Sequence, residues 1–220
     1  MIPLSDASRR PSAFPGVTVA IIVANAVVFM LELAGGDAFV TRWSAVPADI
    51  VAGRHWMTLL TAMFMHAGWL HIIGNMVFFW AFGPEIESAM GPVRYLAFYL
   101  LSGLAAFLAQ IAMMPHSTVP NLGASGAIAG VMGAFIITYP RDRIKTVLLI
   151  GWFVTVTLIP AALLIGLWFL IQLFSGVGAS ANVNGNQEGV AYMAHVGGFV
   201  FGAVTGRLFE SSPRIAPGEP

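Results

Sequence analysis

One apolar stretch near the end of the chain decides the class of fold, and it reads AHVGGFVFGAVTG from Ala194 to Gly206. Gly198, Gly202 and Gly206 recur every four residues, so on a helix they would leave one face as nearly bare backbone. Such a face lets a neighbouring helix pack very closely, as helices do within membranes. The stretch therefore predicts a tightly packed membrane helix, and it carries one histidine, His195.

The composition of the whole chain agrees with a membrane protein. Of its 220 residues, 58% are hydrophobic and only 9% are charged, whereas soluble domains carry about 25% charged residues. Such a chain cannot cover a surface that faces water, so a soluble globule and a disordered chain are excluded. The net charge of zero does not indicate a nucleic-acid partner, and the lack of cysteine excludes disulfides and thiolate chemistry.

Six segments are apolar and long enough, or nearly so, to cross a bilayer, which takes about 20 helical residues. The predicted spans are Val17–Ala34, His71–Met90, Val93–Met114, Ala124–Tyr139, Thr146–Phe174 and Val190–Phe209. We expect an all-α, six-helix membrane bundle over residues 17–209, with residues 1–16 and 210–220 as short cytoplasmic segments. The fourth span is short and rich in glycine, which favours a helix inside the bundle.

The distribution of basic residues sets the orientation of these spans. With the N-terminus in the cytoplasm, eight of the ten Lys and Arg residues lie inside and two lie outside, as the positive-inside rule expects. Those inside are Arg9, Arg10, Arg94, Arg141, Arg143, Lys145, Arg207 and Arg214, and those outside are Arg42 and Arg54. Both termini are therefore expected in the cytoplasm, and a prokaryotic plasma membrane is the simplest location.

Four polar side chains stand inside the predicted spans, where each is costly and is therefore a candidate functional group. They are His71, Asn75, Ser125 and His195. All four lie within about two turns of the start of an even-numbered span, and even-numbered spans run from outside to inside. The four side chains should therefore cluster just below the outer surface, although they are far apart in the sequence.

Ser125 lies at a predicted loop-to-helix junction between Gly123 and Gly126, which permit close backbone approach. A serine at a helix start has free backbone N–H groups beside it that can stabilise an anion. Packing of the glycine faces of the fourth and sixth spans would bring Ser125 within hydrogen-bond reach of His195. The alternative is a serine that caps the helix or lets the spans pack.

The pairing of Ser125 with His195 favours nucleophilic catalysis, because an imidazole can take the serine proton and return it to a leaving amine. The acid nearest to His195 in the sequence is Glu188, in a polar outer segment, so we expect a dyad with no third member. His71 and Asn75 are four residues apart on one helix face and can both donate to an oxyanion. The structural alternative is a polar bridge between spans for His71 and Asn75, and a buried histidine bonded to a backbone carbonyl for His195.

A metal site is the competing chemistry, because all five histidines lie towards the outer side of the predicted topology. His66 and His71 are five residues apart, which is poor spacing for two ligands on one helix face. Cysteine is absent, and no acid joins these histidines within a span. We therefore expect no metal and no other cofactor.

These residues resemble the motifs of the rhomboid intramembrane serine proteases. The pieces are His66-Ala-Gly-Trp-Leu-His71-Ile-Ile-Gly-Asn75, Gly83-Pro-Glu-Ile-Glu87-Ser-Ala-Met-Gly91, Gly123-Ala-Ser125-Gly126, and Ala194-His195-Val-Gly-Gly198 with Gly202. Each piece is weak by itself, but together and in this order they are highly specific. They extend over most of the chain, from about Trp56 to Gly206.

The resemblance implies a role for each matching residue. Ser125 would be the nucleophile and His195 the general base, and the oxyanion hole would comprise Asn75, His71 and the Ser125 N–H. Structural roles would fall to Gly83, Glu87, Gly91, Gly123, Gly126, Gly198 and Gly202. The substrates would be transmembrane segments of other proteins within the lipid bilayer; the sequence does not indicate an oligomeric state.

The resemblance also concerns the loops. The segment Gly35–Leu70 would be a membrane-embedded outer loop, and the segment after the fifth span, Gly176–Gly189, would cover the active site. The sequence departs from the family pattern at two positions. Met57 follows Trp56 where the family often has arginine, and Ala129 replaces an aromatic residue that often packs on the histidine, so His195 should be held less firmly.

Two other functions remain as alternatives. A catalytically silent relative would bind membrane helices as an adaptor or chaperone, and the intact Ser125 and His195 argue against it. A transporter or channel would need polar groups along a full path across the membrane, whereas here they stop at one depth.

Overall fold

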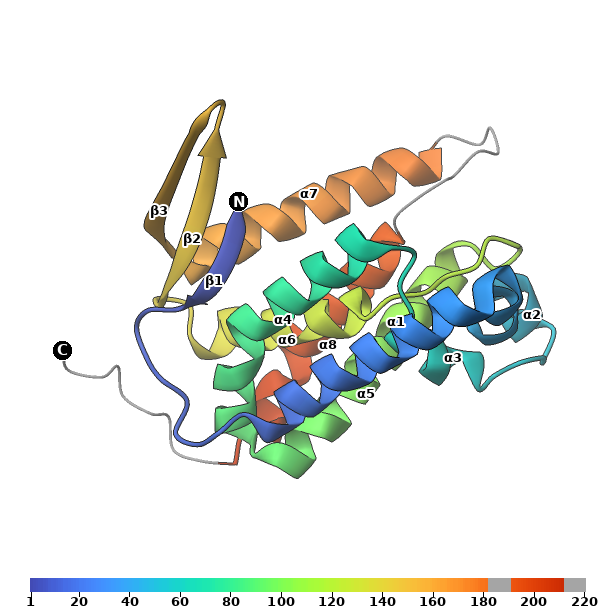
Figure 1. The fold of residues 1–220 in the computed structure, drawn as a ribbon, viewed down its shortest axis with the longest axis horizontal. Helices are drawn as coiled ribbons and strands as arrows, with labels where there is room; N and C mark the ends of the chain where they lie inside the picture. Colours follow the sequence, from blue (N-terminus) through green and yellow to red (C-terminus); the bar gives the residue numbers. More distant parts are fainter. Residues whose placement is uncertain (182–190, 212–220) are drawn as a thin grey trace.

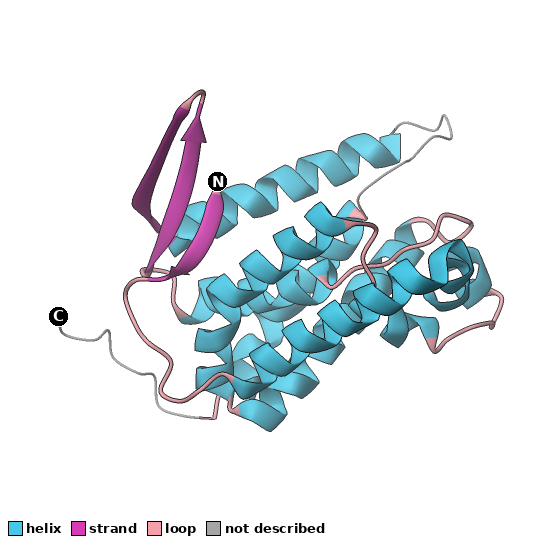
Figure 2. Cartoon of the chain, viewed as in Figure 1, coloured by secondary structure: helices cyan, strands magenta, loops and turns pink. Residues whose placement is uncertain are grey.

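The chain folds into a helical bundle with a small sheet at one end (Figures 1 and 2), and the computed structural model describes residues 1–181 and 191–211. The long helices are α1 (Gly16–Trp43), α4 (Trp69–Met90), α5 (Pro92–Met113), α6 (Ser125–Thr138), α7 (Ala161–Ala181) and α8 (Tyr192–Phe209). The short ones are α2 (Pro47–Val51), α3 (Thr58–Thr61) and the 3-10 turn η1 (Ala62–Phe64). The strands are β1 (Ile2–Asp6), β2 (Arg143–Ile150) and β3 (Phe153–Pro160).

Helix α6 lies at the centre of the bundle, with α4, α5 and α8 around it (Figure 1). Eleven of its 14 residues are buried, so it has almost no outer surface. A helix so placed can be short and composed of small residues, because its neighbours form the outer surface. Its short length and glycine content predict this inner position.

The contact between α6 and α8 is made by backbone atoms. A methyl group added at Gly198 would overlap the carbonyl oxygen of Gly126, and one added at Gly202 would overlap that of Gly130. In the other direction, a methyl group at Gly133 would overlap the carbonyl of Phe199. The two glycine faces therefore meet main chain to main chain, which fixes the relative position of the two helices.

Five of the six predicted spans coincide with helices, namely α1, α4, α5, α6 and α8, within a few residues except that α1 continues to Trp43 past a kink at Gly36. Among the described helices, α1 and α5 are long and apolar enough to cross a membrane alone. A third span results if Thr58–Phe64 and Trp69–Met90, which meet at 89°, count as one broken span. The arrangement of six spans with cytoplasmic termini stays a prediction.

The predicted fifth span, Thr146–Phe174, is wrong in its first half, and the all-α class needs the same correction. Residues 143–160 form the hairpin β2–β3, and the helix begins only at Ala161. The segment is rich in β-branched residues, Gly151 has φ 59° at the turn, and Pro160 would disrupt a helix that included it. Hydropathy does not distinguish such a strand pair from a helix.

Strand β1 makes this hairpin a three-stranded antiparallel sheet in the order β1-β2-β3, with Ile2 opposite Val147. The sheet leaves the helices at the end of α6 and projects from the bundle (Figure 1), and Trp152 at its tip is 99% exposed. The segment 1–16, expected only as a cytoplasmic tail, therefore contains a paired strand.

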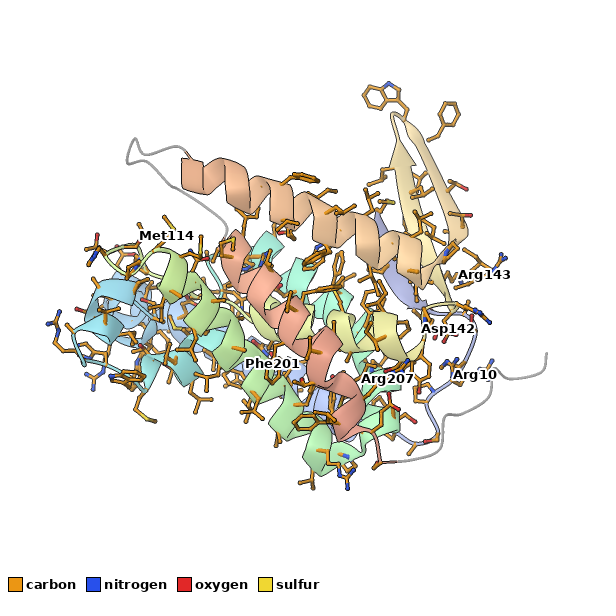
Figure 3. The ribbon with its side chains drawn as sticks, turned by 180° about the vertical axis from the view of Figure 1, so that it is seen from behind. Arg10, Met114, Asp142, Arg143, Phe201 and Arg207 are labelled. Carbon is orange, nitrogen blue, oxygen red and sulfur yellow. The ribbon has the colours of Figure 1, made fainter. Side chains whose placement is uncertain are left out.

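The base of the sheet holds a cluster of charged side chains. The Arg9 guanidinium forms two hydrogen bonds with the Asp142 carboxylate and lies 3.8 Å from the centre of the Tyr139 ring. Asp142 lies where α6 passes into β2, at the same end of the molecule as Arg10, Arg143 and Arg207 (Figure 3). Burial, with a contribution from the neighbouring Asp142, raises the pKa of Asp6 to about 7.

The segment Gly35–Leu70 is an ordered part of the fold. Its short helices pack on α5 through a second apolar cluster, which comprises Ala45, Ile50, Leu59, Ala62, Met63, Phe107 and Ile111. The backbone N–H of His66 donates to Glu32 Oε2 at 2.9 Å, which ties the segment to α1. Residues 176–181 of the second predicted loop continue α7, while residues 182–190, including Glu188, lie outside the described part.

Candidate active site

Ser125 and His195 lie in direct contact. The Oγ of Ser125 is 2.7 Å from the Nε2 of His195, although the residues are 70 positions apart. Ser125 is the first residue of α6, and His195 lies in the first turn of α8. The backbone contact between these helices therefore brings together a nucleophile and a base, with His195 only 8% exposed.

Gly123 controls the approach to Ser125. Its φ of 131° suits glycine, and its N–H donates to the carbonyl oxygen of Ala62 at 2.8 Å. A methyl group at Gly123 would lie 3.2 Å from His71 Nε2 and 3.6 Å from Ser125 Oγ. A side chain at this position would therefore crowd His71 and Ser125.

His71 and the start of α6 carry groups that can donate a hydrogen bond to an anion. His71 Nδ1 accepts a hydrogen bond from the backbone N–H of Ala67 at 3.2 Å. In the neutral ring, Nε2 must then carry the proton, so an N–H lies near Gly123 and Ser125. The first backbone N–H groups of α6, including that of Ser125, have no acceptor within their own helix.

Asn75 supplies a side-chain donor. It lies one helical turn after His71 on α4 and is 9% exposed. Its Nδ2 is buried and has no hydrogen-bond partner among the described residues. Leaving a buried amide donor in this state costs roughly 1–3 kcal/mol, so Asn75 is a candidate donor to a bound ligand.

Helix α7 contributes two residues that the sequence analysis missed. Gln172 Oε1 is 2.7 Å from His195 Nδ1. The ring centroid of Trp168 lies 5.8 Å from that of His195, with the planes inclined at 40°. Ala129, on α6 where the family pattern often has an aromatic residue, has no ring, and the aromatic contact to His195 comes from Trp168 on α7.

A second glutamine lies near the site on α5. Gln110 is 6% exposed, and its Oε1 accepts the backbone N–H of Ala194 at 3.2 Å. This bond holds the first turn of α8 directly beside His195. The sequence offered a signal for Gln110 and Gln172, because both are polar residues at the outer ends of predicted spans, at the depth of Ser125.

The residues of the Gly83–Gly91 motif lie at the other end of α4. Glu87 accepts hydrogen bonds from the backbone N–H groups of Val17 at 2.8 Å and Thr18 at 2.7 Å, at the start of α1. A methyl group at Gly83 would lie 2.8 Å from the Tyr95 hydroxyl, and Gly91 with φ 76° joins α4 to α5. These contacts hold helices together, about 18 Å along α4 from Asn75 to Glu87.

Metal chemistry receives no support from the described part of the chain. Within residues 1–181 and 191–211, no three His, Cys, Asp or Glu side chains form a group that could hold a metal ion. His66 contacts His71 ring to ring at 5.1 Å, but no acid completes a ligand set with them there.

Comparisons with known proteins agree on one family. The rhomboid domain matches residues 53–212. Rhomboid protease GluP of Bacillus subtilis is 29% identical over 191 residues, covering 86% of this chain and 36% of that protein. Rhomboid-like protein 11, chloroplastic, of Arabidopsis thaliana is 28% identical over 161 residues, covering 72% of this chain and 54% of that protein.

A yeast relative gives the same result. Rhomboid protein 1, mitochondrial, of Saccharomyces cerevisiae is 27% identical over 203 residues, covering 85% of this chain and 51% of that protein. The chain thus spans about a third to a half of the length of these relatives. The match includes Ser125, His195, His71 and Asn75 within the rhomboid domain. The chain belongs to the rhomboid family of integral membrane proteins.

Proposed function

We propose that this protein is an intramembrane serine endopeptidase that cleaves transmembrane segments of other membrane proteins. Ser125 is the nucleophile and His195 the general base. The 2.7 Å contact between Ser125 Oγ and His195 Nε2 is the observation that carries the proposal. The name of the Bacillus subtilis relative supports the same reaction class.

The reaction divides into two steps. His195 Nε2 takes the proton of Ser125 as Oγ attacks the scissile carbonyl carbon, and the carbonyl oxygen becomes an oxyanion. The oxyanion accepts hydrogen bonds from the Asn75 amide, the His71 Nε2–H and the Ser125 N–H. When the C–N bond breaks, His195 returns the proton to the leaving amine, and an activated water molecule then hydrolyses the acyl-enzyme.

Water and substrate must both reach Ser125. We infer a cavity open to the outer side of a membrane, because polar groups at membrane depth require a water-filled or protein-lined environment. A substrate helix hides its carbonyl groups in hydrogen bonds, so it must unwind locally before attack. Substrates with helix-weakening residues near the cut site should therefore be preferred. A prokaryotic plasma membrane remains the proposed location.

A fluorophosphonate probe tests the proposal on the purified protein in detergent. We expect labelling of Ser125 in the wild type, and no labelling when Ser125→Ala or His195→Ala is introduced. A single-span substrate with a Gly-Ser pair near the outer end of its span should be cut faster than one with two leucines there. Retained binding of membrane helices without labelling or cleavage would instead indicate a silent relative.

A further inference from the structure

The two ring nitrogens of His195 have different partners. For Nε2 to accept the proton of Ser125, that nitrogen must be unprotonated, so the neutral ring must carry its proton on Nδ1. The Nδ1 atom lies 2.7 Å from Gln172 Oε1. An amide oxygen can only accept hydrogen bonds, so this contact selects the tautomer that a general base requires.

A neutral partner suits this position. During the reaction the imidazole becomes an imidazolium, and a carboxylate would stabilise that charge more strongly. A carboxylate at this depth would, however, be a buried charge whenever the imidazole is neutral, and such charges are costly. The Gln172 amide directs the ring with its dipole and adds no charge to the resting site.

Trp168 restrains the same ring from one turn earlier on α7. Residues 168 and 172 are four apart and share a helix face. Trp168 also lies 6.4 Å from the Phe199 ring, and Phe169 stacks on Phe199 at 4.3 Å. These contacts attach α7 to α8. The hydrogen bond at His195 Nδ1 and the aromatic contact of the ring therefore both come from a helix outside the glycine contact of α6 and α8.

We propose that Gln172, supported by Trp168, is the positioning residue for the general base, so that the placement of α7 sets the reactivity of Ser125. This inference rests on the proposed protease function. It replaces the expected two-residue dyad by a serine–histidine–glutamine array, in which the third member belongs to a separate helix. A shift of α7 would release the imidazole while leaving Ser125 and His195 close together.

Steady-state cleavage of a membrane-spanning substrate by the full chain tests this role. Gln172→Met keeps the size of the side chain but removes the acceptor, and we expect kcat to fall about 10- to 100-fold with KM nearly unchanged. Ile171→Met, at an exposed neighbouring position on α7, is the matched control and should keep the wild-type kcat. A wild-type kcat in Gln172→Met would overturn the inference.

The conservative variant Gln172→Glu should change the pH–rate profile, which would stay the same if Gln172 had only a structural role. It restores an acceptor and adds a negative charge beside Nδ1, which favours the imidazolium. We expect activity close to wild type and an acidic limb of the pH–rate profile that moves to higher pH. An unchanged acidic limb would overturn the inference even if Gln172→Met failed to fold.

The two proposals can fail separately. If the wild type neither cleaves substrate nor reacts with fluorophosphonate at Ser125, the protease function itself is wrong. If the wild type cleaves and Ser125→Ala does not, while both Gln172 variants keep the wild-type kcat and pH profile, only the positioning role is wrong. Trp168→Phe should retain most of the activity, and Trp168→Ala should lose about as much as Gln172→Met.

Discussion

Two regions of different character contact His195: the α6–α8 contact and helix α7. The first is made of opposed backbone atoms, and 11 of the 14 residues of α6 are buried. The second lies at the side of the bundle (Figure 1), with Leu163 and Phe174 more than 60% exposed. The close packing of α6 and α8 thus fixes the distance between Ser125 Oγ and His195 Nε2. The orientation of the imidazole depends instead on the peripheral helix α7.

The largest expected effect comes from removing a reacting group on the rigid side. Ser125→Ala or His195→Ala should lower the rate of cleavage by at least about 10³-fold, because no other described side chain can replace the lost nucleophile or base. The measurement is cleavage of a single-span substrate in detergent or liposomes. Ser102→Ala, which removes another buried serine, is the control, and full activity in Ser125→Ala would refute the mechanism.

Substitution of Asn75 tests whether the proposed oxyanion hole exists. Asn75→Ala should lower kcat by roughly 10²–10³-fold, because a single preorganised donor of this kind is typically worth that much. Asn75→Asp has nearly the same size but lacks the donor, so it should be similarly defective. If both variants kept the wild-type kcat in the cleavage assay, Asn75 would have only a structural role.

A pair of glycine substitutions compares the two regions directly. In Gly202→Ala the added methyl group overlaps the Gly130 carbonyl, so α6 and α8 must separate. We expect a loss of about 1–3 kcal/mol in the free energy of unfolding and slower fluorophosphonate labelling of Ser125. Gly166→Ala on α7 has no neighbouring atom within 4 Å of the added methyl group and should be neutral or slightly stabilising. Equal thermal stabilities of the two variants would contradict the distinction between the regions.

The smallest expected effect concerns the sheet that precedes α7. Asp6 keeps its proton up to a pH of about 7 in the folded state, but only up to about 4 when unfolded. The contribution of Asp6 to the free energy of unfolding is therefore most favourable below pH 4 and is lost as the pH rises towards 7. Asp6→Asn should raise the melting temperature by about 2–4 °C at pH 8 and leave it unchanged near pH 4. The same gain at both pH values, or from the exposed Asp37→Asn, would show that titration of Asp6 is not the cause.

Much of the fold could be predicted because apolar length, glycine spacing and scarce polar residues all indicate the same arrangement. Ser125 and His195 could be paired from the glycine series that begins at Gly198, since bare backbone faces have few other uses. The hairpin could not be predicted, because apolar residues such as Val147 and Leu158 are equally compatible with a strand and with a membrane helix. The features that distinguish the two are the many β-branched residues, the turn at Gly151 and the proline at position 160.

Gln172 was missed for a different reason. Asn75 and Ser125 lie at the starts of even-numbered spans, whereas Gln172 lies near the end of an odd-numbered one. Spans of opposite direction reach the same depth at their ends, and this is where Gln110 and Gln172 lie. Depth in the membrane, regardless of the direction of the helix, is the sequence feature that both glutamines share with Ser125.

The pairing of β1 with β2 also constrains the order in which the molecule is assembled. Arg9 and Asp142 are 133 residues apart, so the ribosome must make four long helices before the strand meets its partner. At about 5–20 residues per second this takes roughly ten seconds. During that time β1 is an unpaired edge, and Pro3 together with the irregular register up to Ser5 makes it a poor template for another chain. The sheet that precedes α7 is therefore completed late in synthesis. The orientation of His195, which depends on α7, is established late as well.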